Sequence, residues 1–225
     1  MKHLFLEGPI QTGKSTLIRQ ALSPYLGSEP LCSSDASGGV GLETFDSLGT
    51  PESFAAPIGG FASQRLTAAG ATSGAAAEKT VAFRIGPAAT TPLTAPLEFY
   101  KNSGGIFKCI GDGGVTVDDS VFETLGVQYL KDTAGRRLML LDEIGGHELK
   151  CAPFMDALLE LLSGDIPCLG VFKMASSVKR MDSSLMELNA RLREAIINSD
   201  GRILYYERGD EAVRAAVEDF VSKIF

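Results

Sequence analysis

The chain has 225 residues, of which 44% are hydrophobic and 22% charged, a composition typical of globular proteins and unlike that of disordered chains. Asp and Glu number 28 and Lys and Arg 21, which gives a net charge of −7. This charge argues against general binding to nucleic acid or anionic membranes, because those partners attract basic surfaces. No apolar run reaches about 18 residues, so we expect no transmembrane helix.

The cysteines and the first residues bear on the cellular compartment. Cys32, Cys109, Cys151 and Cys168 are far apart and form no CxxC pair, which excludes the usual zinc-ligand spacing. The N-terminal apolar stretch is short and ends at Glu7, unlike a secretory signal. We therefore expect reduced thiols, mostly in the core, and a cytoplasmic protein.

Strand and helix patterns alternate at both ends of the chain. In chain order, we expect strands at 3–7, 138–141, 168–172 and 203–206, and helices with apolar stripes at 17–25, 154–162 and 213–224. Such alternation indicates an α/β fold with a mainly parallel central sheet between two layers of helices.

The middle of the chain has a different composition. Residues 27–59 are rich in Gly, Ser, Ala and Pro and are predicted to form a loop or lid. Residues 60–66 and 80–85 are predicted to form a hairpin, and 105–110 a further strand, so we interpret 60–110 as a hairpin-rich insertion. Ser120 and Glu123 have capping-box spacing and predict a helix start. No domain boundary is evident, and we interpret 1–225 as a single domain.

The segment after the first predicted strand reads GPIQTGKS and fits G-x-x-x-x-G-K-[ST] at every fixed position. In this motif, a P-loop, backbone N–H groups and the N-terminus of the next helix surround phosphate groups. Lys14 would contact the β- and γ-phosphates, and the Ser15 hydroxyl would bind Mg²⁺. The residues predicted to bind nucleotide are Gly8, Pro9, Ile10, Gln11, Thr12, Gly13, Lys14, Ser15 and Thr16.

A second motif follows the apolar run Leu138–Leu141. Asp142 would lie at the carboxyl end of a buried strand, where ligands gather in open α/β sheets, and would bind Mg²⁺ with Ser15. Glu143 would activate the attacking water, so Glu143 and Lys14 are the predicted catalytic residues. The alternative is a strand end with two solvated acids. Asp142–Gly145 also fits the D-x-x-G pattern of GTPases, but no N-K-x-D motif accompanies it, so a Ras-like GTPase is not expected.

The P-loop, the Gly60-Phe61 pair and the stretch DEIGGHEL at 142–149 together resemble the P-loop nucleoside-triphosphatase family, found in thermophilic microbes and in animals as cancer-related nucleoside-triphosphatase. The resemblance covers 1–26 and about 120–225, and 60–86 loosely. It implies a P-loop NTPase fold and Mg²⁺-dependent hydrolysis of ATP, GTP and other nucleoside triphosphates, with slow turnover and loose base selectivity. It also implies that Glu148 occupies a second acidic position of the motif.

The chain departs from the family pattern at three places, one of which is residues 27–59, an insertion relative to compact family members. Gly146 and His147 stand where the family commonly has Lys and Met, so a cation that could stabilise charge on the transferring phosphoryl group is missing. An acidic family run is replaced by SQRLT at 63–67, in which Arg65 is either an electrostatic substitute or a surface residue. We expect His147 to form local hydrogen bonds rather than to act as a base.

Three functions remain open from the sequence. The first is a Mg²⁺-dependent nucleoside-triphosphatase. The second is a small-molecule or nucleotide kinase, with Arg191 and Arg193 as a cationic lid. The third is a non-catalytic accessory protein in which bound nucleotide orders the 27–59 segment. All three take a nucleoside triphosphate as ligand.

Overall fold

The computed structural model describes residues 1–26, 56–68, 80–100, 104–111 and 113–225. The strands are β1 (His3–Glu7), β2 (Ile58–Thr67), β3 (Thr80–Pro87), β4 (Thr94–Pro96), β5 (Ile106–Gly111), β6 (Gly114–Val117), β7 (Leu138–Ile144), β8 (Cys168–Phe172) and β9 (Gly201–Tyr205). The helices are α1 (Lys14–Leu22), α2 (Val127–Lys131), α3 (Ala152–Ser163), α4 (Ala175–Met181), α5 (Leu185–Asn198) and α6 (Glu211–Ile224).

Within the described residues, nine strands form one sheet in the order β6-β5-β3-β2-β7-β8-β1-β9, with β4 paired to β2. Strands β2, β7, β8, β1 and β9 are parallel, whereas β3, β5 and β6 continue the sheet in antiparallel pairs. The prediction of an α/β fold with a mainly parallel sheet is confirmed. After each parallel strand, the chain must return to the end of the sheet where the strands begin. Helices provide such connections.

The hairpin predicted from the middle of the chain is present as β2 and β3, and β5 pairs with β3 as a further strand. However, β2 is part of the parallel sheet, with Ile58 opposite Leu138 of β7, and is therefore not confined to an inserted hairpin. It also begins inside the 27–59 segment that we expected to be loop. The remainder of that expectation, residues 27–55, lies outside the described residues.

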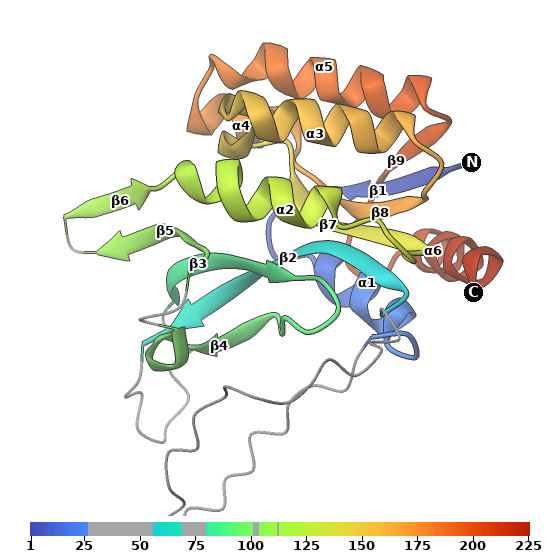
Figure 1. Ribbon diagram of the computed structural model, residues 1–225, viewed down its shortest axis with the longest axis horizontal. Coiled ribbons are helices and arrows are strands. Elements are labelled where there is room, and N and C mark those ends of the chain that lie inside the picture. The colour runs from blue at the N-terminus through green and yellow to red at the C-terminus, as the bar shows by residue number, and fades with distance from the viewer. Residues whose placement is uncertain (27–55, 69–79, 101–103, 112) are drawn as a thin grey trace, which may run out of the picture.

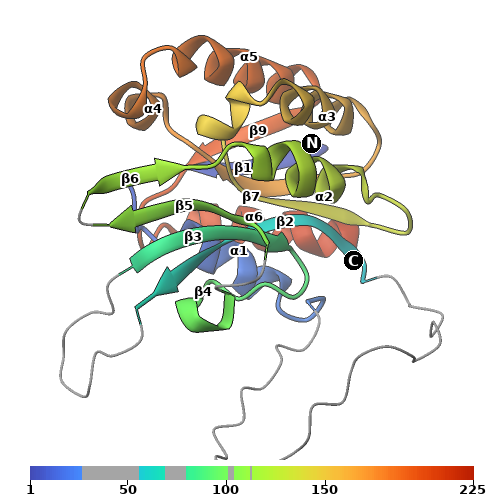
Figure 2. The ribbon, with the colours of Figure 1, turned by 60° about the vertical axis from the view of Figure 1, so that its left-hand side comes forward.

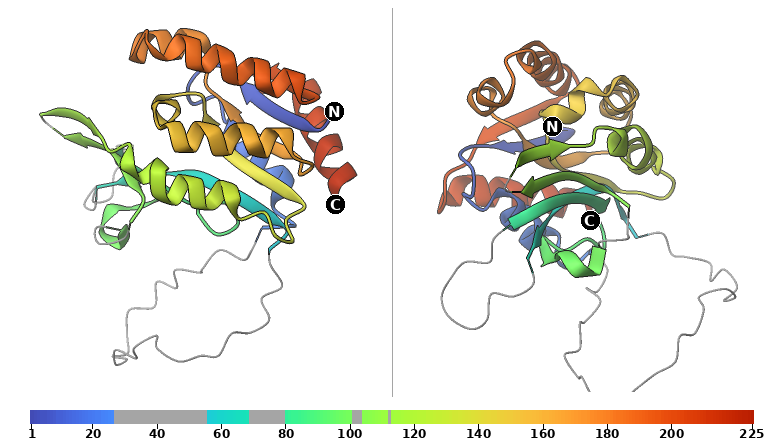
Figure 3. Two further views of the ribbon diagram at one scale, coloured as in Figure 1. Left: turned by 45° about the horizontal axis from the view of Figure 1, so that its top comes forward. Right: turned by 90° about the vertical axis from the view of Figure 1, so that its left-hand side faces the viewer.

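The helices form a layer on each face of the sheet (Figures 1 and 2). Helices α2, α3, α4 and α5 cover one face, and α1 and α6 cover the other. Both chain termini lie at the edge where the parallel strands begin, so the P-loop and the acidic motif lie at the opposite edge (Figure 3). In the part of the chain that the structure describes, no helix has the length and apolar character needed to cross a bilayer.

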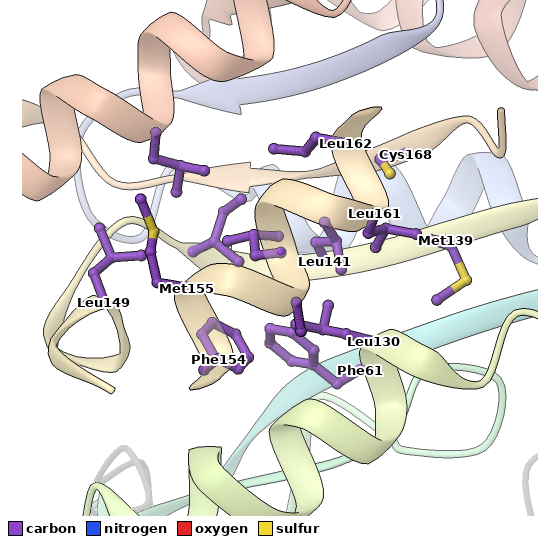
Figure 4. Packing of buried hydrophobic residues seen from close by; sticks show 14 of the residues in the cluster. Phe61, Leu130, Met139, Leu141, Leu149, Phe154, Met155, Leu161, Leu162 and Cys168 are labelled. Carbon is purple, nitrogen blue, oxygen red and sulfur yellow. The ribbon is translucent and has the colours of Figure 1, made fainter. Parts of the chain in front are cut away.

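The larger hydrophobic cluster lies between the sheet and α3 (Figure 4). The predicted apolar stripe of this helix is buried, and Phe154 is fully enclosed. Its ring lies 5.9 Å from that of Phe61 on β2 and 5.3 Å, edge to face, from that of Phe122. Leu141 of β7 packs in the same cluster, so the strand with the acidic motif is held by the core.

Strand β1 is buried on both faces, with Phe5 in one hydrophobic cluster and Leu4 in the other. His3 at its start is also buried. The backbone N–H of Cys168 donates to His3 Nδ1 over 3.0 Å, so the ring proton resides on Nε2, which donates to the carbonyl of Leu162 at 3.0 Å. Burial lowers the pKa of His3 to about 4, and the ring is therefore neutral at pH 7.

Two smaller expectations are confirmed in part. A helix begins at Ser120, as predicted, but it has no capping box, because Asp118 Oδ1 accepts hydrogen bonds from both the N–H and the hydroxyl of Ser120. A π-helical turn, Phe122–Gly126, then leads into α2. The three cysteines among the described residues are free thiols, as expected; Cys151 and Cys168 are buried, whereas Cys109 is exposed. Cys32 lies outside the described residues.

Candidate active site

The P-loop joins the end of β1 to the start of α1. Gly8 has a φ of 150° and Gly13 a φ of 94°, and Gln11 also has a positive φ of 62°. Glycine tolerates such angles because it has no Cβ. A Cβ on Gly8 would lie 2.2 Å from the carbonyl oxygen of Tyr206, so this position excludes every side chain. Beyond Gly13, the first amides of α1 have no partner within the helix and are available to an anion.

Lys14 lies across the loop that precedes it. Its Nζ donates to the carbonyl oxygens of Gly8, at 3.0 Å, and Pro9, at 2.6 Å, and lies 3.3 Å from Thr12 Oγ1. Burial lowers the pKa of Lys14, although the negative charge of Glu143 opposes this effect. The ammonium is thus already partly desolvated, and a phosphate oxygen can replace the neutral carbonyls as its partner.

Asp142 lies beside the P-loop in space. Its Oδ1 accepts a hydrogen bond of 2.7 Å from the hydroxyl of Ser15, 127 residues earlier in the sequence. Ser63 of β2 donates to the backbone carbonyl of Asp142 at 3.0 Å. Burial raises the pKa of Asp142 to about 6; the charge of Glu143 adds to this effect, and the hydrogen bond from Ser15 opposes it. The two residues predicted to bind Mg²⁺ are therefore in direct contact.

Glu143 differs from its neighbour in exposure. Its side chain is 46% exposed, and its φ is 68°. Its Oε1 lies 3.4 Å from Nζ of Lys173, which directly follows β8. Glu148 is buried instead, and its Oε1 accepts hydrogen bonds from the N–H groups of Gly145 at 2.5 Å and Gly146 at 2.7 Å. Glu148 therefore holds the backbone turn, whereas Glu143 is available to a ligand.

A cavity of about 530 Å³ connects these groups. Of the predicted nucleotide-binding and catalytic residues, Gly8, Ile10, Gln11, Thr12, Gly13, Lys14, Ser15, Thr16 and Glu143 line it. Pro9 and Asp142 do not. Phe83 and Phe107 from the antiparallel strands also line it, and the Lys108 ammonium lies over the ring of Phe83. The cavity is thus lined by the P-loop, by Glu143 and by an aromatic wall of Phe83 and Phe107.

The structure also places the other residues that the sequence analysis discussed. Arg65 is exposed and His147 is half-buried, and both line the cavity. Arg193 is not part of a lid, since its guanidinium pairs with Glu7 and lies over the ring of Phe172. Arg191 is exposed and does not line the cavity. The kinase interpretation therefore loses its proposed cations.

Sequence analysis missed Lys173, which lines the cavity. A Cβ built on Gly146 would lie 3.0 Å from the Lys173 ammonium, so this lysine occupies space next to the position where the resemblance implies one. Burial acts to lower the pKa of Lys173, but Glu143 and Glu148 outweigh it and the pKa is raised. Its place directly after an apolar strand was the one available signal, because parallel strands end at a common edge.

Comparison with known proteins agrees with the motifs. A family model described as NTPase matches residues 79–199, more than half of the chain. The chain belongs to this NTPase family. The matched segment includes Asp142, Glu143 and Lys173, whereas the P-loop precedes it. The resemblance inferred from the sequence is thereby confirmed at the level of the family.

The fold is also found in a solved structure. The crystal structure of THEP1 from the hyperthermophile Aquifex aeolicus superposes with a TM-score of 0.51 and 15% sequence identity, covering 99% of this chain and 98% of that one. At this identity the likeness concerns the fold, and it confirms the P-loop NTPase architecture. No curated protein matches the sequence of this family member.

Proposed function

We propose that this NTPase family member is a Mg²⁺-dependent nucleoside-triphosphatase in which water attacks the γ-phosphate. The observation that carries the proposal is the 2.7 Å hydrogen bond between Ser15 and Asp142. It joins the P-loop to the acidic end of β7, and Glu143, the next residue, faces the same cavity. A phosphate-binding loop, a pair of metal-binding oxygens and a carboxylate are thus within reach of one ligand.

In the proposed complex, the backbone N–H groups of the loop Gly8–Ser15, which Pro9 alone lacks, and that of Thr16 surround the phosphates, and Lys14 exchanges its carbonyl partners for phosphate oxygens. The donor set fits Mg²⁺, because Ser15 and Asp142 supply a hydroxyl and a carboxylate oxygen 2.7 Å apart. Within the described residues, no cluster of three or more His, Cys, Asp or Glu forms a complete metal site. Phosphate oxygens and water would therefore supply the other ligands. Bound Mg²⁺ would neutralise charge on the phosphates.

Glu143 is the proposed water-activating residue. Its partial exposure into the cavity leaves the carboxylate free to accept a hydrogen bond from water, whereas Asp142 is buried against Ser15. The proton of the attacking water would pass to Glu143 as the oxygen–phosphorus bond forms. Lys14 would stabilise the charge on the γ-phosphoryl oxygens. We extend the proposal to a single nucleotide-binding domain over 1–225, loose base selectivity and a cytoplasmic location.

One observation favours a second candidate function. Besides the P-loop and Glu143, the rings of Phe83 and Phe107 line the cavity. An apolar acceptor molecule could bind there, and the protein would then transfer the γ-phosphoryl group to it. A kinase of this kind releases almost no phosphate in the absence of its acceptor, so a hydrolysis assay separates the two functions.

The test is a malachite-green assay of phosphate release from ATP, GTP, CTP and UTP, with and without Mg²⁺. We expect release only with Mg²⁺ and at similar rates for the four nucleotides. Glu143→Gln should bind nucleotide but lose turnover by about 10²-fold or more. Glu218→Gln, on the exposed face of α6, is the matched control and should retain the parent rate. Parent-like turnover of Glu143→Gln would contradict the role given to Glu143.

A further inference from the structure

Hydrogen bonds connect the backbone of Lys173 to the residues that follow Glu143. Its N–H donates to the carbonyl of Ile144 at 2.8 Å. Its own carbonyl accepts a hydrogen bond of 3.1 Å from Asn189 Nδ2, which also donates to the carbonyl of Gly145 at 2.8 Å. Asn189 is buried. Residue 173 therefore cannot move relative to the end of β7 unless buried hydrogen bonds break.

The side chain of Lys173 lies between two carboxylates with different roles. On one side is Glu148, which is buried and held by two backbone N–H groups. The point where a Cβ on Gly146 would stand lies 3.1 Å from Glu148 Oε2 and 3.0 Å from the Lys173 ammonium. On the other side, the ammonium lies 3.4 Å from Glu143 Oε1. Lys173 is only 19% exposed, so solvent screens these attractions weakly.

Glu143 needs such a partner. Its side chain is 46% exposed, and the described residues provide no other ion pair to its carboxylate. A free glutamate samples several rotamers, and only some of them direct its carboxylate toward the same point. A misplacement of about 1 Å in a catalytic group can cost about 10²-fold in rate.

We propose that Lys173 is a positioning residue for hydrolysis, which acts through Glu143 by holding its carboxylate toward the γ-phosphate end of the cavity. This inference rests on the proposed function. It assigns to the lysine after β8 a role distinct from that of Lys14: Lys14 holds the phosphates, and Lys173 holds the residue that activates water.

A double-mutant cycle tests this role. Lys173→Met keeps the length of the side chain and removes the charge. It should lower kcat by about 10-fold to 10²-fold, with the Kd for a fluorescent ATP analogue within about twofold of the parent value. In the Glu143→Gln background, Lys173→Met should have no further effect on kcat, because the residue it positions is already inactive. A purely structural lysine would lower kcat equally in both backgrounds.

Lys223→Met is the control, since Lys223 also pairs with a carboxylate, that of Asp219, but on the exposed surface of α6. It should retain the parent kcat. Lys173→Gln provides a second cycle if the Met variant does not fold, with the same result expected. If the parent is active, the role of Lys173 alone is overturned by either of two results. The Lys173 variants turn over at the parent rate, or the substitution lowers kcat by the same factor in both backgrounds. A parent that releases no phosphate overturns the proposed function, and with it this inference.

Discussion

Protonation of His3 should weaken the fold, because the buried ring is held as a neutral group at the start of the strand that leads to the P-loop. Its Nδ1 accepts the hydrogen bond from the N–H of Cys168, so a proton there breaks that bond and places a charge in the core. The pKa of His3 is lowered from 6.5 to about 4 by burial. At 1.36 kcal/mol per pKa unit, this corresponds to about 3 kcal/mol of unfolding free energy.

The sign follows from proton binding. Between about pH 4 and pH 6.5 the unfolded chain binds a proton at His3 and the folded chain does not. The stabilisation is therefore complete above pH 6.5 and is lost as the pH falls toward 4. Asp142 acts in the opposite direction, because its pKa is raised to about 6 and the folded chain binds the extra proton in much of the same window. The parent protein alone would therefore show a small net change.

Comparison of the parent with His3→Gln isolates the histidine, since Asp142 titrates in both proteins. The measurement is the free energy of unfolding from urea titrations at pH 4, 5, 6 and 7.5. Between pH 7.5 and pH 4, the parent should lose about 3 kcal/mol more of its free energy of unfolding than His3→Gln does. A difference that stays constant over this range would refute the assignment of a buried, neutral His3.

Three further predictions follow from the site and the core. Lys14→Ala should abolish binding of a fluorescent nucleotide, because the phosphates lose their cation; parent-like affinity would contradict the P-loop assignment. Asp142→Asn should raise the Mg²⁺ concentration for half-maximal phosphate release by about tenfold or more, and an unchanged Mg²⁺ titration would exclude Asp142 as a ligand. Phe154→Ala should lower the free energy of unfolding by about 3–5 kcal/mol, since its ring is fully buried. Phe99→Ala, at a side chain that is 62% exposed, should change it by less than about 1 kcal/mol in the same urea titration.

The sequence identified the residues that belong to motifs of consecutive positions. The P-loop needs eight adjacent residues between a strand and a helix, and the structure has this order over β1 and α1. Asp142 could be inferred because it ends an apolar run. Its contact with Ser15 required only that two parallel strands end at one edge of the sheet.

The missed features depend on which elements become neighbours. Ser63 and Lys173 contact the acidic motif because β2 and β8 flank β7, an order that the sequence does not state. The parallel pairing of β2 was likewise hidden, since Ile58 and Leu138 are 80 residues apart. The helix cap is a local error: Asp118, and not Glu123, accepts the N–H of Ser120.

The sheet has a parallel part and an antiparallel part, and the two parts contribute different groups to the cavity. The groups proposed to hold the phosphates and Mg²⁺ lie in the loop after β1, in α1 and in β7, whereas the aromatic wall of the cavity comes from the antiparallel strands β3 and β5. Substitutions at Phe83 or Phe107 can reshape what the cavity admits without disturbing Ser15 or Asp142. Evolution could thus diversify the choice of ligand in this architecture while the proposed phosphate chemistry stays constant.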